Sequence, residues 1–312
     1  MKIQLKRFAL VMAGVLTLIS APLASDTSQI VGRWEGFGQS DTDGRFIIPC
    51  IDVQNPGHHN RFRAKVELDS GEIQPCIFPV EATLSNPGVI NGIGIDSHGH
   101  WLLIHGKSRA VGDGSVRIAA FQYKVLHWYG RLKDEGHMAF VQMIGGANWD
   151  DIAGDHLESA FEGRYDPVGP RRGGALEAAL RNVGGGRTGR GTTMVEGDLT
   201  FFDVQRQNDD PFFFDLGAEL MGTVGPPVAQ SNATTRAQFA ALGLSGPPQP
   251  GVPNGIIAIL IGQVIHDDRA IVPCVIPGDY RLYRSVADVF ANVFHGRNSS
   301  FSRGEFFLPA VQ

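Results

Sequence analysis

The chain has 312 residues, with 27 Lys and Arg against 32 Asp and Glu, 10 His and 3 Cys. The net charge of −5 argues against a nucleic-acid-binding protein, and three cysteines are too few for a disulfide scaffold or an all-cysteine zinc site. A hydrophobic content of 43% allows a packed core, and 40 Gly with 18 Pro favour turns over long helices.

The first 25 residues have the composition of a secretory signal peptide. Three basic residues stand within the first seven positions, followed by an apolar run at residues 8–20 and small residues at 21–25. A run of 13 residues is too short to span a bilayer, and no later apolar run is longer. We therefore expect a signal peptide over residues 1–25 and a soluble mature protein that is secreted or periplasmic, without a membrane span. Removal of the signal peptide, with its three basic residues, takes the net charge from −5 to −8.

The rest of the chain reads as β structure. Short runs rich in Ile, Val, Phe and Thr are separated by Asp-Gly, Pro-Gly and similar turn dipeptides at the spacing of a strand plus a turn. This pattern predicts an all-β fold, an antiparallel barrel or sandwich, with few short helices. The strands expected in the first part are residues 31–39, 45–53, 61–68, 73–84, 101–110, 116–126 and 138–144.

Changes in composition divide the mature chain into two β domains. We expect an N-terminal antiparallel domain at residues 30–166, a Gly/Arg-rich linker at 167–193 and a C-terminal β-rich domain at 194–312. Within the linker, residues 175–182 are a short helical candidate. Residues 184–191 are Gly-rich but lack the Lys-Ser/Thr ending of a phosphate-binding loop, so they are interpreted as linker.

An internal repeat supports two related domains. Residues 38–50 align without a gap on residues 262–274, with seven of thirteen positions identical. Each copy reads as a hairpin with an acidic tip, at Asp43 and at Asp267, that ends in Pro-Cys. We interpret the two copies as a duplicated hairpin, one in each domain.

All three cysteines follow a proline within an apolar strand. A Cys50–Cys76 disulfide would close a loop of about 25 residues, worth roughly 3 kcal/mol, whereas Cys50–Cys274 would join the two copies of the repeat. A simple meander places Cys50 and Cys76 two strands apart, about 9.5 Å, beyond the limit of ~7 Å for a disulfide. Their pairing therefore needs a bulge or a switch between sheets. We predict the Cys50–Cys76 bond, with Cys274 buried and free.

Histidines supply the candidate metal chemistry. His98 and His100 are two residues apart, so on an extended strand both side chains share one face and reach one divalent ion, completed by a third ligand. Gly92 with this His-x-His pair resembles the opening of the first cupin motif, although Leu103 and its neighbours replace the glutamate that the cupin motif has next. The acidic residues between positions 150 and 162 are a further candidate, for calcium.

Aromatic residues accompany the histidines. Trp101, His127, Trp128 and Tyr129 combine flat rings with polar groups, which suits a small-molecule or glycan site. Near the start of the mature chain, Gly32-Arg33-Trp34 resembles the Gly-x-Trp opening of lipocalins, in which the tryptophan plugs the base of a barrel.

Two functions remain open from the sequence. The first is an exported β protein that binds a small molecule, a glycan or a partner protein, because hydrolase motifs such as Gly-x-Ser-x-Gly and His-Glu-x-x-His are absent from the sequence. The alternative is a metal-dependent enzyme that uses His98 and His100. Neither the ligand nor the oligomeric state can be read from the sequence.

Overall fold

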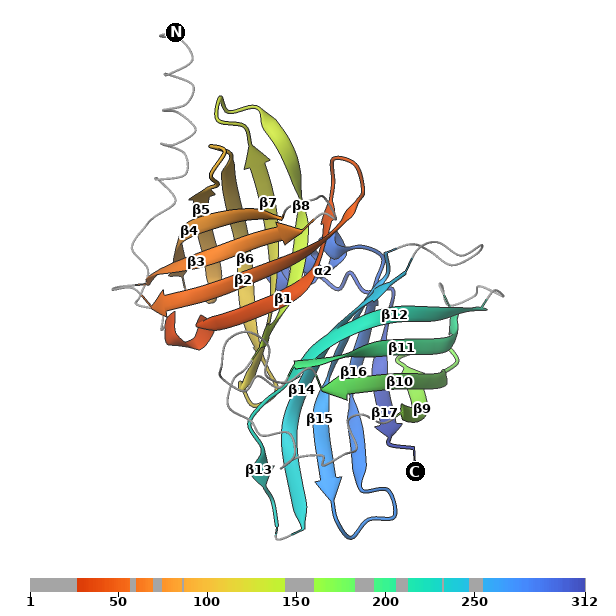
Figure 1. The fold of residues 1–312 in the computed structure, drawn as a ribbon. Coiled ribbons are helices and arrows are strands. Elements are labelled where there is room, and N and C mark those ends of the chain that lie inside the picture. Colours follow the sequence, from red (N-terminus) through yellow and green to blue (C-terminus); the bar gives the residue numbers. More distant parts are fainter. Residues whose placement is uncertain are drawn as a thin grey trace.

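The computed structural model describes residues 27–56, 60–69, 75–85, 87–143, 160–182, 194–205, 213–231, 233–246 and 255–311. These residues form two eight-stranded antiparallel barrels (Figure 1). In both barrels consecutive strands are neighbours and the last strand pairs with the first, so the fold is up-and-down. The prediction of an all-β fold with two related domains is confirmed, and the architecture is a barrel rather than a sandwich.

The N-terminal barrel consists of β1 (Gly32–Ser40), β2 (Phe46–Pro56), β3 (Arg61–Asp69), β4 (Cys76–Ser85), β5 (Val89–Ile95), β6 (Trp101–Val111), β7 (Val116–Leu126) and β8 (Leu132–Met143). Strand β3 shows why it closes around a core: Phe62, Ala64, Val66 and Leu68 are buried, and the polar residues between them face outward. The alternation expected from the sequence therefore places apolar side chains in the barrel interior and polar side chains on the solvent-exposed outer face.

The base of this barrel is plugged as the lipocalin resemblance implies. A short 3-10 helix, η1 (Thr27–Ile30), precedes β1, and Trp34 is only 3% exposed. The Trp34 indole Nε1 donates a hydrogen bond to the Ile30 carbonyl at 3.0 Å, so the buried ring keeps a polar partner.

Strand β5 was missing from the expected strands because two glycines weaken its β pattern. Both are required by packing: a Cβ on Gly92 would lie 2.8 Å from side-chain atoms of Ile104 and Val80, and one on Gly94 would lie 2.6 Å from the Pro79 carbonyl oxygen. With β5 in place, the barrel has the even number of strands that allows first and last to pair.

The C-terminal barrel begins earlier than the sequence suggested. It consists of β9 (Ala160–Pro167), β10 (Gly174–Asn182), β11 (Met194–Gln205), β12 (Phe213–Val224), β14 (Thr234–Ser245), β15 (Ile257–Asp267), β16 (Cys274–Tyr283) and β17 (Ser302–Pro309), with the short β13 (Val228–Ala229) beside β14. Strand β9 pairs with β10 and β17, so residues 160–166 belong to the second barrel and not to the first.

Strand β10 also corrects the helix expected at residues 175–182. Its Ala, Leu and Glu favour a helix in isolation, but Leu176, Ala178 and Leu180 are buried while their neighbours are exposed. Burial at every second residue fits a strand on the barrel wall, and this tertiary contact overrides the local preference.

The longest helix, α2 (Val286–His295), connects β16 to β17. Ser285 caps its start by accepting a hydrogen bond from the Asp288 amide at 3.2 Å, and Gly296 ends it with φ of +70°. Ser-x-x-Asp before an apolar run, with a glycine after the run, is the sequence signal that indicates this helix.

Helix α2 lies between the barrels. Its apolar side chains share a buried cluster with the outer faces of both, including Val116 and Val141 of the first barrel and Ile257 of the second.

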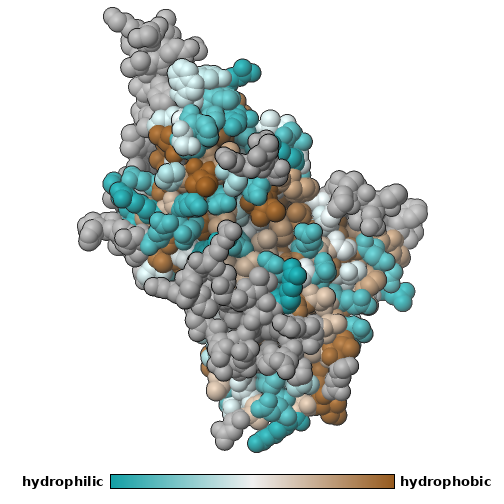
Figure 2. Space-filling model, in the orientation of Figure 1, coloured by the Kyte–Doolittle hydropathy of each residue, from teal (hydrophilic) through white to brown (hydrophobic). Residues whose placement is uncertain are grey.

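On the face seen in Figure 2, hydrophobic side chains interrupt the hydrophilic surface over the N-terminal barrel and at the lower end of the C-terminal barrel. Within the described residues, no helix has the length and apolar character needed to cross a bilayer.

Both copies of the internal repeat form antiparallel hairpins, β1–β2 and β15–β16. Their tips are alike: Asp43 accepts a hydrogen bond from the Arg45 amide at 3.1 Å, and Asp267 accepts one from the Arg269 amide at 3.0 Å. The strand registers differ, however. Gly38 is opposite Ile47, whereas Gly262 is opposite Gly278. The likeness is therefore local to the turn and does not extend along the strands.

Candidate functional site at the barrel rim

The candidate site lies at the end of the N-terminal barrel opposite the base. In an up-and-down barrel the turns after β1, β3, β5 and β7 all lie at one end, and η1 lies at the other. The predicted metal ligands are in the turn between β5 and β6, and three of the four predicted ligand-binding residues are in the turn between β7 and β8. We call this end the rim.

Asp96 organises the turn between β5 and β6. Its Oδ1 accepts hydrogen bonds from the backbone amides of His98 at 2.9 Å and His100 at 2.7 Å, and Gly99 turns the chain with φ of +81°. The Asp96 Oδ2 lies 2.8 Å from the Nδ1 of His100. A carboxylate that holds Nδ1–H leaves the Nε2 lone pair of the imidazole available to a metal ion.

The sequence predicted that the two histidines share one face of a strand. They do not, because residues 96–100 form a turn. They are brought together by Asp96 instead: one ligand atom from each of Asp96, His98 and His100 lies within 4.8 Å of the others. The side chains differ in exposure, at 76% for His98, 18% for His100 and 4% for Asp96. The cluster is thus anchored on its buried side and open to solvent on the other.

The neighbouring turn adds a third imidazole. The ring centroid of His127 lies 5.4 Å from that of His100, and the centroids of His98 and His100 are 6.1 Å apart. Two imidazoles on one tetrahedral zinc have centroids about 5 Å apart, given the usual Zn–N distance. His127, which sequence analysis assigned to an organic ligand, therefore lies next to His100, while the group whose ligand atoms lie within 4.8 Å of one another consists of Asp96, His98 and His100.

The other predicted ligand-binding residues surround this histidine. Tyr129 stacks on the His127 ring at 5.1 Å with planes only 4° apart, and Trp128 packs edge-on to Tyr129 at 5.3 Å. Trp128 is 69% exposed and Tyr129 is 48% exposed. Trp101 follows His100 at the start of β6, is half-buried, and lies opposite Ile95 and Leu126.

Electrostatics favour an ionised Asp96. Burial by itself would raise the pKa of this carboxyl group, but the hydrogen bonds from the His100 ring and from the amides of His98 and His100 outweigh it, so the pKa of Asp96 is lowered. A negative charge is therefore fixed beneath the imidazoles, where a bound cation would be stabilised.

Buried apolar side chains pack together inside the N-terminal barrel. A cavity of about 20 Å³ remains beside Trp34, Phe62 and Phe121, which is room for about one water molecule. Around these three rings the described side chains therefore leave no room for a ligand larger than a water molecule.

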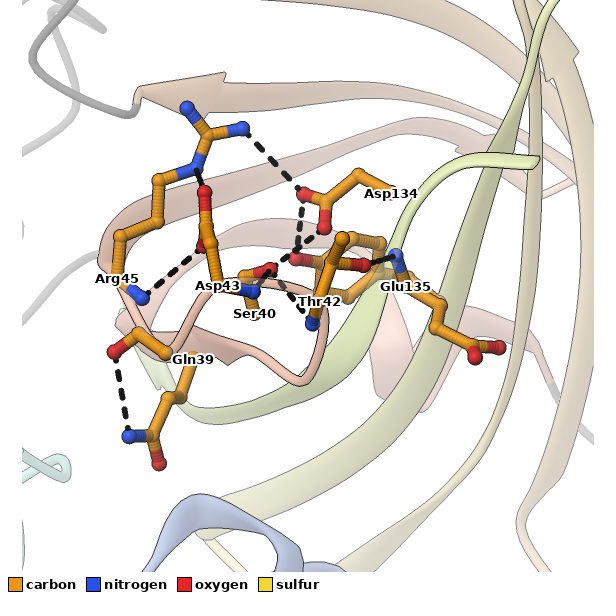
Figure 3. A network of polar contacts seen from close by, with 9 residues as sticks. Gln39, Ser40, Thr42, Asp43, Arg45, Asp134 and Glu135 are labelled. Carbon is orange, nitrogen blue, oxygen red and sulfur yellow. Dashed lines mark hydrogen bonds and ion pairs between the residues drawn. The ribbon is translucent and has the colours of Figure 1, made fainter.

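A buried polar network ties the first turn to β8 at the same end of the barrel (Figure 3). Asp134 accepts hydrogen bonds from the Ser40 hydroxyl at 2.6 Å and the Tyr123 hydroxyl at 3.0 Å, and its Oδ2 lies 3.7 Å from the Arg45 guanidinium. Arg45 also pairs with Asp43 at 3.3 Å. Burial, and then the Asp134 charge, raise the pKa of Tyr123, which keeps the phenol protonated as a donor.

The predicted disulfide is wrong: Cys50, Cys76 and Cys274 are all free thiols. Strand β3 lies between β2 and β4, with Cys50 opposite Glu67 and Cys76 opposite Leu68. The simple meander thus keeps the two thiols two strands apart. Burial raises the pKa of Cys50 to about 11 and that of Cys274 to about 12, which disfavours nucleophilic chemistry at either.

Two further candidates lie outside the described residues. They are the Gly-rich segment at 184–191 and most of the acidic residues between positions 150 and 162.

No protein-family model and no curated protein match this chain. One solved structure that matches is a DUF3598-family protein of unknown function from Nostoc punctiforme PCC 73102, which is 10% identical over 91% of this chain and 97% of that chain, with a TM-score of 0.22. A TM-score this low does not show a shared fold.

Proposed function

We propose that the rim of the N-terminal barrel binds a divalent transition-metal ion through His98 and His100, which Asp96 brings together, with the His127 imidazole next to His100. The observation that carries this proposal is the clustering of Asp96, His98 and His100 within 4.8 Å, with Asp96 holding the Nδ1 of His100. Imidazole donors suit zinc, copper and nickel better than calcium or magnesium, which prefer oxygen ligands. Asp96 acts here as the residue that orients His100.

The aromatic residues next to the histidines are where an organic ligand would meet the ion. Exposed Trp128 and Tyr129 offer flat apolar faces beside the metal position, and Trp101 lies at the same end of the barrel. A small molecule or glycan bound there would contact both metal and ring. We favour binding as the function of this site, with metal-dependent catalysis as the alternative, and we propose that the protein is exported.

Zinc titration by calorimetry tests the metal site. The protein should bind one Zn²⁺, and a His98→Ala, His100→Ala double variant should lose this binding. Asp96→Asn should weaken binding ~10–100-fold, the usual effect of removing a carboxylate that orients a metal-bound histidine. His266→Ala is the matched control, because His266 pairs with Asp268 at 2.8 Å in the other barrel. Equal zinc binding by the double variant would contradict the proposal.

An activity comparison separates the alternatives. If the site is catalytic, zinc-loaded protein should hydrolyse an activated ester such as p-nitrophenyl acetate faster than metal-free protein, and His127→Ala should remove the difference. If the site only binds, the two forms should hydrolyse the ester at the same rate.

A further inference from the structure

A groove between the two barrels is independent of the rim. It has a volume of about 750 Å³ and is formed by the outer face of β9, β17, β16 and β15 together with the end of β6. Figure 1 shows that end of the first barrel reaching down beside β14. The volume is in the range of small-molecule sites, which commonly lie between domains.

One side of the groove is basic. Arg109 comes from β6 of the first barrel and Arg281 from β16 of the second. The Arg281 guanidinium donates to Asn292 Oδ1 at 3.1 Å, and within the described residues neither arginine has a carboxylate partner. Two arginines from different barrels therefore line the same groove.

The adjacent part of the groove is acidic. Asp279 on β16 lies directly opposite Glu305 on β17, and both are exposed. Like charges opposite each other destabilise a strand pair, and within the described part of the chain neither carboxylate has a basic partner. The nearest acidic neighbour, Asp166 on β9, is instead paired with Arg164 at 3.3 Å.

The two regions have a fixed separation. Asp279 and Arg281 are two residues apart on one strand, so they face the same side with Cα atoms about 7 Å apart. Alongside them on β15, Ile261 lies opposite Asp279 and Ile259 lies opposite Arg281. The groove thus offers an apolar strip that joins an acidic region to a basic one.

We propose that this groove binds a zwitterionic small molecule, with its anionic group on Arg109 and Arg281, its cationic group on Asp279 and Glu305, and a hydrocarbon segment over Ile259 and Ile261. Such a ligand satisfies both charge sets at once. A simple anion would meet repulsion from the carboxylates, and a simple amine would meet repulsion from the guanidinium groups.

Three probes of similar length test this: 6-aminohexanoate, hexanoate and 1-aminohexane, titrated by ligand-observed NMR at low ionic strength so that the charges are not screened. We expect 6-aminohexanoate to bind at least tenfold more tightly than either singly charged probe. Equal or tighter binding of hexanoate or 1-aminohexane, or no detectable binding of 6-aminohexanoate by folded protein, would overturn the proposal.

Variants assign the binding to the groove. Arg281→Gln and the pair Asp279→Asn, Glu305→Gln should each lower the affinity for 6-aminohexanoate at least tenfold. Arg181→Gln is the control, since Arg181 pairs with Glu196 at 3.3 Å outside the groove and carries the same charge change as Arg281→Gln. Thermal melting without ligand checks that each variant is folded. Unchanged affinity in both groove variants would place the site elsewhere and contradict the proposal.

Discussion

Removing the Asp134 carboxylate should destabilise the N-terminal barrel strongly. Asp134 is 8% exposed and accepts hydrogen bonds from the hydroxyls of Ser40 and Tyr123. In Asp134→Ala both buried hydroxyls lose their charged acceptor, at about 1–3 kcal/mol each. The 3.7 Å contact with Arg45 adds little, because that side chain is 39% exposed. We therefore expect the free energy of unfolding to fall by about 2–6 kcal/mol.

Urea unfolding followed by tryptophan fluorescence measures this loss where it occurs. Of the four tryptophans, Trp34, Trp101 and Trp128 lie in the N-terminal barrel. The control is Glu81→Ala, which breaks an ion pair with Arg63 whose side chains are 77% and 80% exposed and should cost at most about 1 kcal/mol. A loss in Asp134→Ala no larger than in this control would refute the assignment of the network as a stabilising one.

The remaining predictions concern thiols, pH and export. Cys50 and Cys274, with raised pKa values, should react slowly with Ellman's reagent at pH 8 in native protein, whereas denatured protein should show three free thiols; a disulfide-linked peptide in a non-reducing map would contradict this. Partial burial, and then the charge of His295, lower the pKa of the His105 imidazole in the folded protein. The folded state is therefore fully stable with respect to this group above about pH 6.5, where His105 is neutral in both states, and it loses stability as the pH falls from there through the lowered pKa. The melting temperature of His105→Gln should accordingly fall less between pH 7.5 and pH 5 than that of the parent, and an equal fall would show that His105 does not contribute. If the signal peptide is cleaved as predicted, the mature chain should begin near Ser25 or Asp26, and N-terminal sequencing that finds intact Met1 would exclude cleavage.

Local sequence patterns were enough to predict the fold class. The alternation in β3 and the turn dipeptides predict strands and turns without any knowledge of the tertiary structure, because side-chain period and turn conformation depend only on neighbouring residues. The same holds for the base of the first barrel, where Gly-x-Trp indicated a plug at Trp34. Within the rim, His98 and His100 were found because they lie in one short turn. The helix α2 was also readable, from Ser285 and Gly296, although it was not predicted.

Other features depend on contacts between distant segments. Residues 175–182 favour a helix locally and become β10 because burial of alternate side chains against the barrel core is worth more than helix propensity. The cysteines remain unpaired because β3 separates the strands that carry Cys50 and Cys76. Likewise, His127 lies beside His100 because β6 pairs with β7, with Trp101 opposite Leu126, which sets the turn after β7 beside the turn after β5. The sequence by itself determined the fold class, most strands and turns of the first barrel and the histidine pair. The strand β10, the boundary between the barrels and the groove between them were decided by tertiary structure, since hydrogen bonding and packing between distant strands place them.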